Sequence, residues 1–66
     1  MNEYKYQEYR KKAIENPTEE NLNALAEWLF MYGGSYWNGE TWDIDNGMRL
    51  YPIYDENGNI IKYEIK

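Results

Sequence analysis

The chain has 66 residues, of which twelve are acidic and seven basic, so its formal net charge is −5. This length allows one domain with one core, and the excess of acid disfavours general binding to phosphate backbones. Cysteine and histidine are both absent, which excludes a disulfide framework and a zinc site of the usual kind. No apolar stretch approaches the roughly 20 residues that span a bilayer, and we expect a cytoplasmic protein that does not bind membranes.

Helical periodicity begins near the N-terminus. Residues 2–15 predict a first helix, for which Asn2 is a suitable N-cap. Such a helix places Tyr6, Tyr9 and Ala13 on one side, where they can face a core.

A capping motif predicts the start of a second helix. Asn16 can cap it, Pro17 suits the first helical position, and Glu19 can complete a capping box. Apolar side chains then follow on two sides of the helix, which indicates two packing neighbours. They are Leu22, Leu25, Ala26 and Leu29 on one side, and Ala24, Trp28 and Met31 on the other. Gly33 or Gly34 is expected to end this helix in the left-handed conformation.

Three Asn-Gly pairs divide the rest of the chain into short segments. They are Asn38-Gly39, Asn46-Gly47 and Asn57-Gly58. Asn-Gly favours two-residue hairpin turns, because both turn residues take a positive φ. We therefore predict a single α+β domain over residues 1–66, in which an αα hairpin (1–32) packs on a three- or four-stranded antiparallel meander (35–66).

Two-residue turns also predict the strand registers. The turn at Asn57-Gly58 sets three pairs on one apolar face: Tyr54 with Ile61, Pro52 with Tyr63, and Leu50 with Ile65. The turn at Asn46-Gly47 sets Trp42 opposite Tyr51 on the other face, together with Ile53. Two helices cover only one face of a small sheet, so the second face is expected to expose these three residues within a polar rim. The rim consists of Glu40, Arg49, Lys62 and Glu64.

An apolar centre with a polar rim is typical of a protein interface. We therefore predict a protein-binding site with an acidic edge that suits a host protein, such as a basic nucleic-acid-binding one. Its residues are Tyr36 and Trp37 at the adjoining hairpin, Trp42, Tyr51 and Ile53 on the sheet, and Glu40, Asp43 and Asp45 at the charged edge.

Three alternatives to this site remain open from the sequence. A turn longer than two residues would flip one strand and send the aromatic rings into the core. The aromatic face can also pair with itself in a homodimer or larger oligomer. Finally, the aromatic hairpin at residues 33–42 can hold a sugar or another small ligand.

The sequence predicts no catalytic residue, metal site or cofactor. The usual nucleophile and base residues are missing, and Ser35 has no evident partner. Neither acidic cluster has the spacing of a calcium-binding EF-hand. Glu40, Asp43 and Asp45 leave only a weak adventitious cation site. We therefore expect a protein that is not an enzyme.

Three segments carry a resemblance to known proteins: LAEWLFMYGGSYWNGE (25–40), LYPIY (50–54) and YEIK (63–66). The chain resembles, over nearly its whole length, short acidic proteins encoded in phages and mobile elements of Gram-positive bacteria. Such accessory proteins commonly bind a host factor, and counter-defence inhibitors, including anti-CRISPR proteins, are one recurrent kind. The resemblance implies a phage-encoded inhibitor of a host protein and transfers no catalytic residue.

Overall fold

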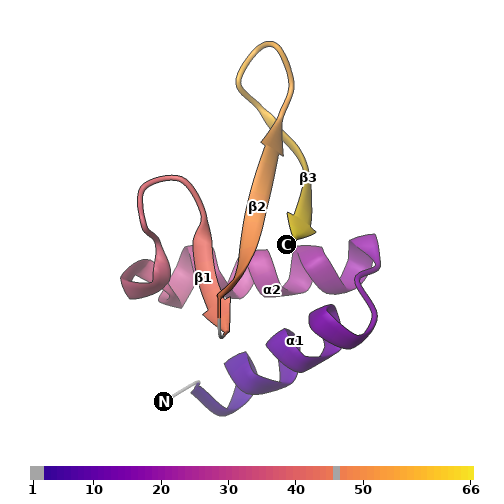
Figure 1. The fold of residues 1–66 in the computed structure, drawn as a ribbon, viewed down its shortest axis with the longest axis vertical. Helices are drawn as coiled ribbons and strands as arrows, with labels where there is room; N and C mark the ends of the chain where they lie inside the picture. The colour runs from indigo at the N-terminus through magenta and orange to yellow at the C-terminus, as the bar shows by residue number, and fades with distance from the viewer. Residues whose placement is uncertain (1–2, 46) are drawn as a thin grey trace.

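The computed structural model describes residues 3–45 and 47–66, so the predicted cap at Asn2 and the turn residue Asn46 lie outside the described residues. Two helices, a short 3₁₀ turn and three strands follow one another along the chain: α1 Glu3–Glu15, α2 Glu19–Tyr32, η1 Gly34–Tyr36, β1 Trp42–Asp45, β2 Met48–Tyr54 and β3 Ile60–Ile65. The strands form one antiparallel sheet in the order β1-β2-β3 (Figure 1). The predicted α+β arrangement is confirmed.

The second helix begins later than its capping motif predicted. Thr18 is the N-cap, with extended backbone angles, and its hydroxyl accepts a hydrogen bond from the backbone N–H of Asn21 at 3.2 Å. The Asn16 carbonyl instead accepts a hydrogen bond from the Asn21 side chain at 2.8 Å. The prediction that Asn16 caps α2 is therefore wrong, because the Thr18 hydroxyl satisfies the free amide in the first turn.

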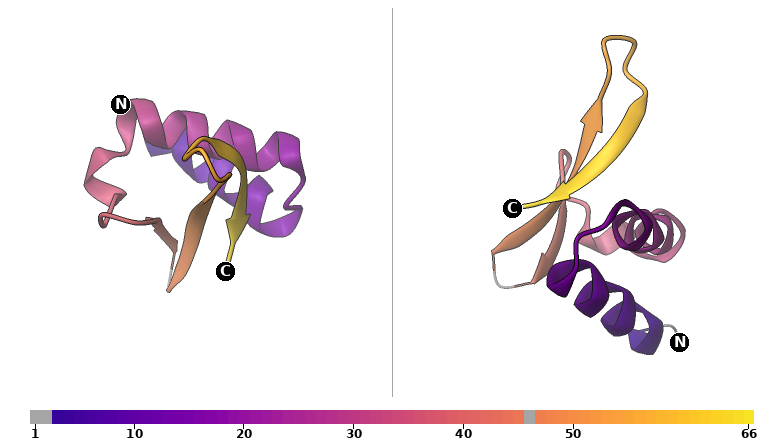
Figure 2. Two further views of the ribbon diagram at one scale, coloured as in Figure 1. Left: turned by 90° about the horizontal axis from the view of Figure 1, so that it is seen from above. Right: turned by 90° about the vertical axis from the view of Figure 1, so that its right-hand side faces the viewer.

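The core lies between the helices and the inner face of the sheet. Figure 2 shows both helices on the same side of the sheet. The buried apolar side chains are Tyr6 and Ala13 from α1, Leu22, Leu25, Ala26 and Leu29 from α2, and Trp42, Ile44 and Leu50 from the sheet. Three leucines, Leu25, Leu29 and Leu50, are the largest that are fully buried. The apolar line predicted for α2 therefore forms the centre of this core.

Tyr6 connects α1 to both α2 and the sheet. Its ring stacks on Trp28 and Tyr36, at centroid distances of 4.7 and 4.9 Å. Its hydroxyl donates a hydrogen bond to the Ile44 carbonyl at 3.2 Å, and the Arg10 guanidinium donates to the same oxygen at 3.1 Å. Burial raises the pKa of Tyr6 above its usual 10.0, and the nearby Arg10 charge offsets part of that effect.

We expect the domain to lose stability as the pH rises above 10. The unfolded chain ionises its tyrosines near their usual pKa of 10.0, whereas burial raises the pKa of both Tyr6 and Tyr63 in the folded state. Folded protein then binds more protons than unfolded protein, so the free energy of unfolding falls with increasing pH. Thermal unfolding between about pH 8 and pH 11 measures this decline. Tyr6→Phe should make it shallower, and an unchanged pH dependence in that variant would contradict the assignment.

A β-bulge turns Trp42 toward the core. The register pairs are Trp42 with Leu50, Asp43 with Arg49, and Asp45 with Met48. Ile44 is the extra residue, so Trp42 and Ile44 lie on the inner face with exposures of 5% and 2%. The prediction that Trp42 pairs with Tyr51 and faces outward is therefore wrong. The alternative in which the aromatic rings enter the core holds for Trp42 alone, since Tyr51 stays on the outer face, and a bulge flips the strand and not a longer turn.

The β2–β3 hairpin contains a longer loop and a bulge, and their effects on the strand register cancel. The pairs are Leu50 with Ile65, Pro52 with Tyr63, and Tyr54 with Ile60. The first two pairs were predicted and are confirmed. The third prediction, that Tyr54 pairs with Ile61, is wrong by one residue. The connecting loop is longer than two residues, since the Asp55 amide donates to the Asn59 carbonyl at 2.8 Å. A bulge beside Tyr54 then restores the predicted register for the rest of the two strands.

Candidate functional site

The eight residues of the predicted binding site do not form one surface. Trp37 and Trp42 are in contact with one another near the end of α2. On the outer face of the sheet lie Asp43, Tyr51 and Ile53. Tyr36 and Asp45 lie toward α1, and Glu40 lies in the loop before β1. The bulge in β1 is the main reason for this division, because it moves Trp42 away from the outer face.

The outer face of the sheet keeps two of the predicted apolar residues. Tyr51 and Ile53 are both half-buried. The Lys66 ammonium lies 5.3 Å from the centre of the Tyr51 ring, and Lys62 lies opposite Ile53 in the register. With Trp42 turned inward, this face lacks the aromatic centre that the sequence predicted, and its surface is mostly charged.

The three acidic residues of the predicted edge have different surroundings. Asp43 is exposed and accepts a hydrogen bond from Arg49 Nε at 3.0 Å. Asp45 is half-buried beside α1. Glu40 is exposed, and its amide donates to the Asn38 side-chain oxygen at 2.9 Å. Within residues 3–45 and 47–66, no group of three or more His, Cys, Asp or Glu side chains is placed to hold a metal ion.

Exposed rings gather instead where the end of α2 meets the β2–β3 hairpin. Phe30, Trp37 and Tyr54 are 57%, 38% and 52% exposed. They border an apolar hollow of ≈ 280 Å³, named here the aromatic groove. Its lining residues are Phe30, Gly34, Trp37, Trp42, Pro52, Tyr54 and Ile60. Large rings at the mouth of an apolar hollow are suited to contact with another molecule.

Trp42 supports the rings of the aromatic groove from below. Phe30 meets it edge to face, with the ring centroids 5.4 Å apart, and Trp37 tilts against it at 4.7 Å. The Trp42 indole N–H is buried and has no acceptor among the described residues. A buried donor without a partner costs about 1–3 kcal/mol. Trp42 thus belongs to the site as its support and not as an exposed contact.

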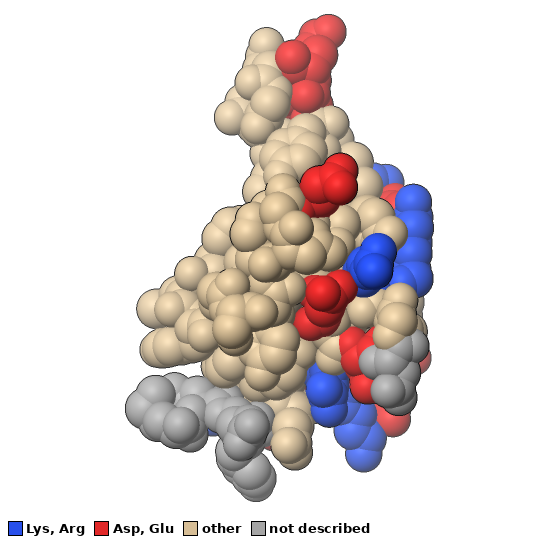
Figure 3. All heavy atoms as spheres, turned by 60° about the vertical axis from the view of Figure 1, so that its left-hand side comes forward, with Lys and Arg blue, Asp and Glu red and all other residues tan. Residues whose placement is uncertain are grey.

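Acidic side chains border the aromatic groove. Asp55 and Glu56 follow Tyr54 at the hairpin tip, and Glu40 lies in the loop after Trp37. Figure 3 shows a wide uncharged area with acidic side chains at the hairpin tip and with both acidic and basic side chains along one margin. The acidic residues at the hairpin tip and in the loop before β1 favour a partner with positive charge.

The sequence analysis found Trp37 and Trp42 but missed the other rings of the groove. A signal for Phe30 exists in the run WLFMY at residues 28–32, which is apolar on every side of the helix. A helix at the surface cannot bury all of such a run. Tyr54 lies on the inner side of the sheet, as predicted, but Figure 1 shows that the hairpin extends beyond α2, which leaves its ring exposed.

Comparisons of the chain with family models, with curated proteins and with solved structures gave no match. Within the described part of the chain, neither helix is long and apolar enough to cross a lipid bilayer. Function is therefore inferred from the surface of the chain itself.

Proposed function

We propose that this chain is a non-enzymatic protein-binding accessory factor, and that the aromatic groove is its contact surface. The observation that carries the proposal is the exposure of Phe30, Trp37 and Tyr54 around one apolar hollow. Exposed apolar patches of this kind mark interaction sites in small proteins. Tryptophan and tyrosine are also the residue types most enriched at interface hot spots.

The proposed partner is a host protein with a basic surface. The net charge of −5 and the acidic residues beside the groove attract cations over several ångströms and suit a protein that normally binds nucleic acid. The resemblance to phage accessory proteins supports an inhibitor of a host factor, of the counter-defence or anti-CRISPR type. Apolar rings then supply the contact, and the acidic residues direct the approach.

The proposal is tested by affinity capture from a nuclease-treated bacterial lysate at low and high salt. Wild-type protein should retain a specific partner at both salt concentrations, because contacts between rings are insensitive to screening. Trp37→Ala should weaken that capture at least roughly tenfold. Tyr51→Ala is the matched control, since it removes an aromatic ring from the outer face of the sheet and should leave capture unchanged.

Two results would contradict the proposal, provided that circular dichroism shows each variant to be folded. Loss of the partner with Tyr51→Ala but not with Trp37→Ala would place binding on the outer face. No captured protein, combined with a mass that rises with concentration and that Trp37→Ala lowers, would assign the groove to self-association.

A further inference from the structure

The two edges of the sheet differ in what covers them. Along β1, Trp37 forms an antiparallel bridge to Trp42. The Ile44 carbonyl further along the same strand accepts hydrogen bonds from Tyr6 and Arg10 of α1. The backbone of β1 is therefore occupied by other parts of the chain, as natural proteins commonly arrange for an edge strand.

The edge of β3 is open. Arg49 and Lys66 exchange two backbone hydrogen bonds of 3.0 Å each. Bonded and non-bonded pairs alternate along an antiparallel ladder, so Tyr63 and Ile65 direct their N–H and C=O groups away from β2. Among the described residues, no hydrogen bond reaches these groups. They are available to a strand that lies beside β3.

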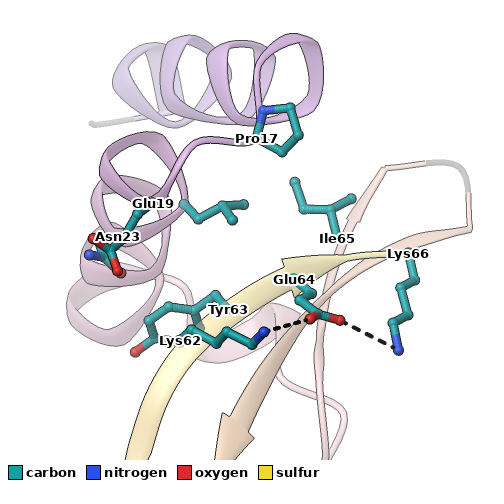
Figure 4. A pocket seen from close by; sticks show the side chains of 9 residues that line it. Pro17, Glu19, Asn23, Lys62, Tyr63, Glu64, Ile65 and Lys66 are labelled. Carbon is teal, nitrogen blue, oxygen red and sulfur yellow. Dashed lines mark ion pairs between the residues drawn. The ribbon is translucent and has the colours of Figure 1, made fainter.

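A groove runs beside this open edge. It has a volume of ≈ 400 Å³ and lies between β3 and the start of α2. Figure 4 shows Pro17 and Ile65 pointing toward one another across it, and Leu22 adds a further apolar side chain. Figure 2 shows that the end of α1 and the start of α2 extend past β3. The helices thus provide a floor under the position where a fourth strand would lie.

We propose that the edge of β3 accepts an extended segment of a partner protein as a fourth strand of the sheet. This site is separate from the aromatic groove and goes beyond the function proposed above. Successive side chains of a strand point to opposite faces, so the partner residues next to Tyr63 and Ile65 are apolar and pack on Pro17 and Leu22. Backbone hydrogen bonds supply affinity, and the groove supplies the preference for apolar residues at alternate positions.

The residue between the two apolar ones faces the other side of the sheet, beside the charged side chains of β3. There, Glu64 pairs with both Lys62 and Lys66, at 3.3 and 3.6 Å. Two cations share one carboxylate, so the outer side of β3 carries an excess of positive charge, whereas Glu19 lies across the groove on α2. An acidic residue in the partner segment complements that charge. The chemistry of the segment is therefore apolar, acidic, apolar.

A second copy of this chain does not suit the same edge. The helices that extend past β3 in one copy would meet the corresponding helices of the other, because paired sheets would bring both sets to the same face (Figure 2). Two copies of β3 would also place the Lys62 and Lys66 side chains of both strands beside one another, which adds repulsion. A lone extended segment has no such helices and fits over the floor.

The probe is a peptide selected by binding to the immobilised full chain. It comes from a library of random peptides, each about eight residues long, which is the length of a long strand. We expect the recovered peptides to alternate apolar and acidic residues. A synthetic copy of the most enriched peptide should slow amide hydrogen exchange at Tyr63 and Ile65 at least roughly tenfold, since both amides gain a hydrogen-bond partner. No enrichment over uncoated support, or binding that leaves both exchange rates unchanged, would overturn the proposal.

Ile65→Pro removes the amide that faces the groove without removing a bond between β2 and β3. It should weaken the selected peptide roughly tenfold, the effect of a lost hydrogen bond, while the matched variant Ile65→Val keeps the amide and the affinity. Trp37→Ala should also bind the peptide normally, which separates this site from the aromatic groove.

Equal binding by Ile65→Pro and Ile65→Val would overturn the proposal. So would concentration-dependent protection of both amides without peptide, since that result makes a second copy the occupant.

Discussion

Trp42→Ala is expected to unfold much of the protein at room temperature. Trp42 is 5% exposed, pairs with Leu50 and supports the rings of Phe30 and Trp37. Truncation of a buried tryptophan lowers the free energy of unfolding by about 3–5 kcal/mol. A single core in a chain this short rarely supplies more than about 3–5 kcal/mol in total. Urea denaturation followed by circular dichroism measures the loss.

Two variants serve as controls for this experiment. Trp42→Phe keeps an aromatic ring and removes the indole N–H that has no acceptor among the described residues, so its loss should be much smaller. Trp37→Ala removes a ring that is 38% exposed and should leave the protein folded. An unchanged urea midpoint in Trp42→Ala would mean that Trp42 faces solvent, and it would contradict the bulge in β1.

Gly33→Ala is expected to lower the free energy of unfolding by about 2–3 kcal/mol, the effect of forcing an extra methyl group into a filled space. A Cβ at Gly33 would lie 2.6 Å from Leu29 Cδ2 and 3.0 Å from Leu29 Cα. Leu29 is fully buried, so neither its side chain nor the helix can move aside freely. The φ of Gly33 is −100°, so the predicted left-handed stop is wrong, and glycine is needed at this position for lack of space.

Gly34→Ala is the matched control for that prediction. Gly34 is exposed, and a Cβ at this position would have no other atom within 4 Å apart from those of its chain neighbours. Because an alanine at a compatible position restricts the unfolded chain, this variant should be neutral or more stable by about 0.4–1 kcal/mol. Thermal midpoints of the two variants give the comparison. Equal losses in both would show that the backbone, and not the contact with Leu29, decides the effect.

The fold class was predictable because its signals are local. The apolar spacing of Leu22, Leu25 and Leu29 identifies the buried side of α2. The glycine of each Asn-Gly pair has a positive φ, with values of 106°, 88° and 84° at Gly39, Gly47 and Gly58. The loops at residues 38–41 and 56–58 are nevertheless longer than the two-residue turns predicted there. Spacing and turn chemistry act within a few residues, so the sequence shows them directly.

The site was less predictable, because it depends on one step of register. The bulge at Ile44 has no local signal in the sequence, and it transfers Trp42 from one face of the sheet to the other. Burial of that ring in the core stabilises the shifted register, which is a tertiary effect. The exposure of Tyr54 is also tertiary, since it depends on how far the hairpin extends beyond α2.

The unequal edges of the sheet also limit how the protein can assemble with itself. A fibril that grows by pairing strands needs two open edges on every molecule, one to join the assembly and one to receive the next molecule. In this chain the bridge from Trp37 to Trp42 and the bonds from α1 to Ile44 close one edge. A molecule that pairs through β3 offers no second edge, so growth by this route stops after the first addition.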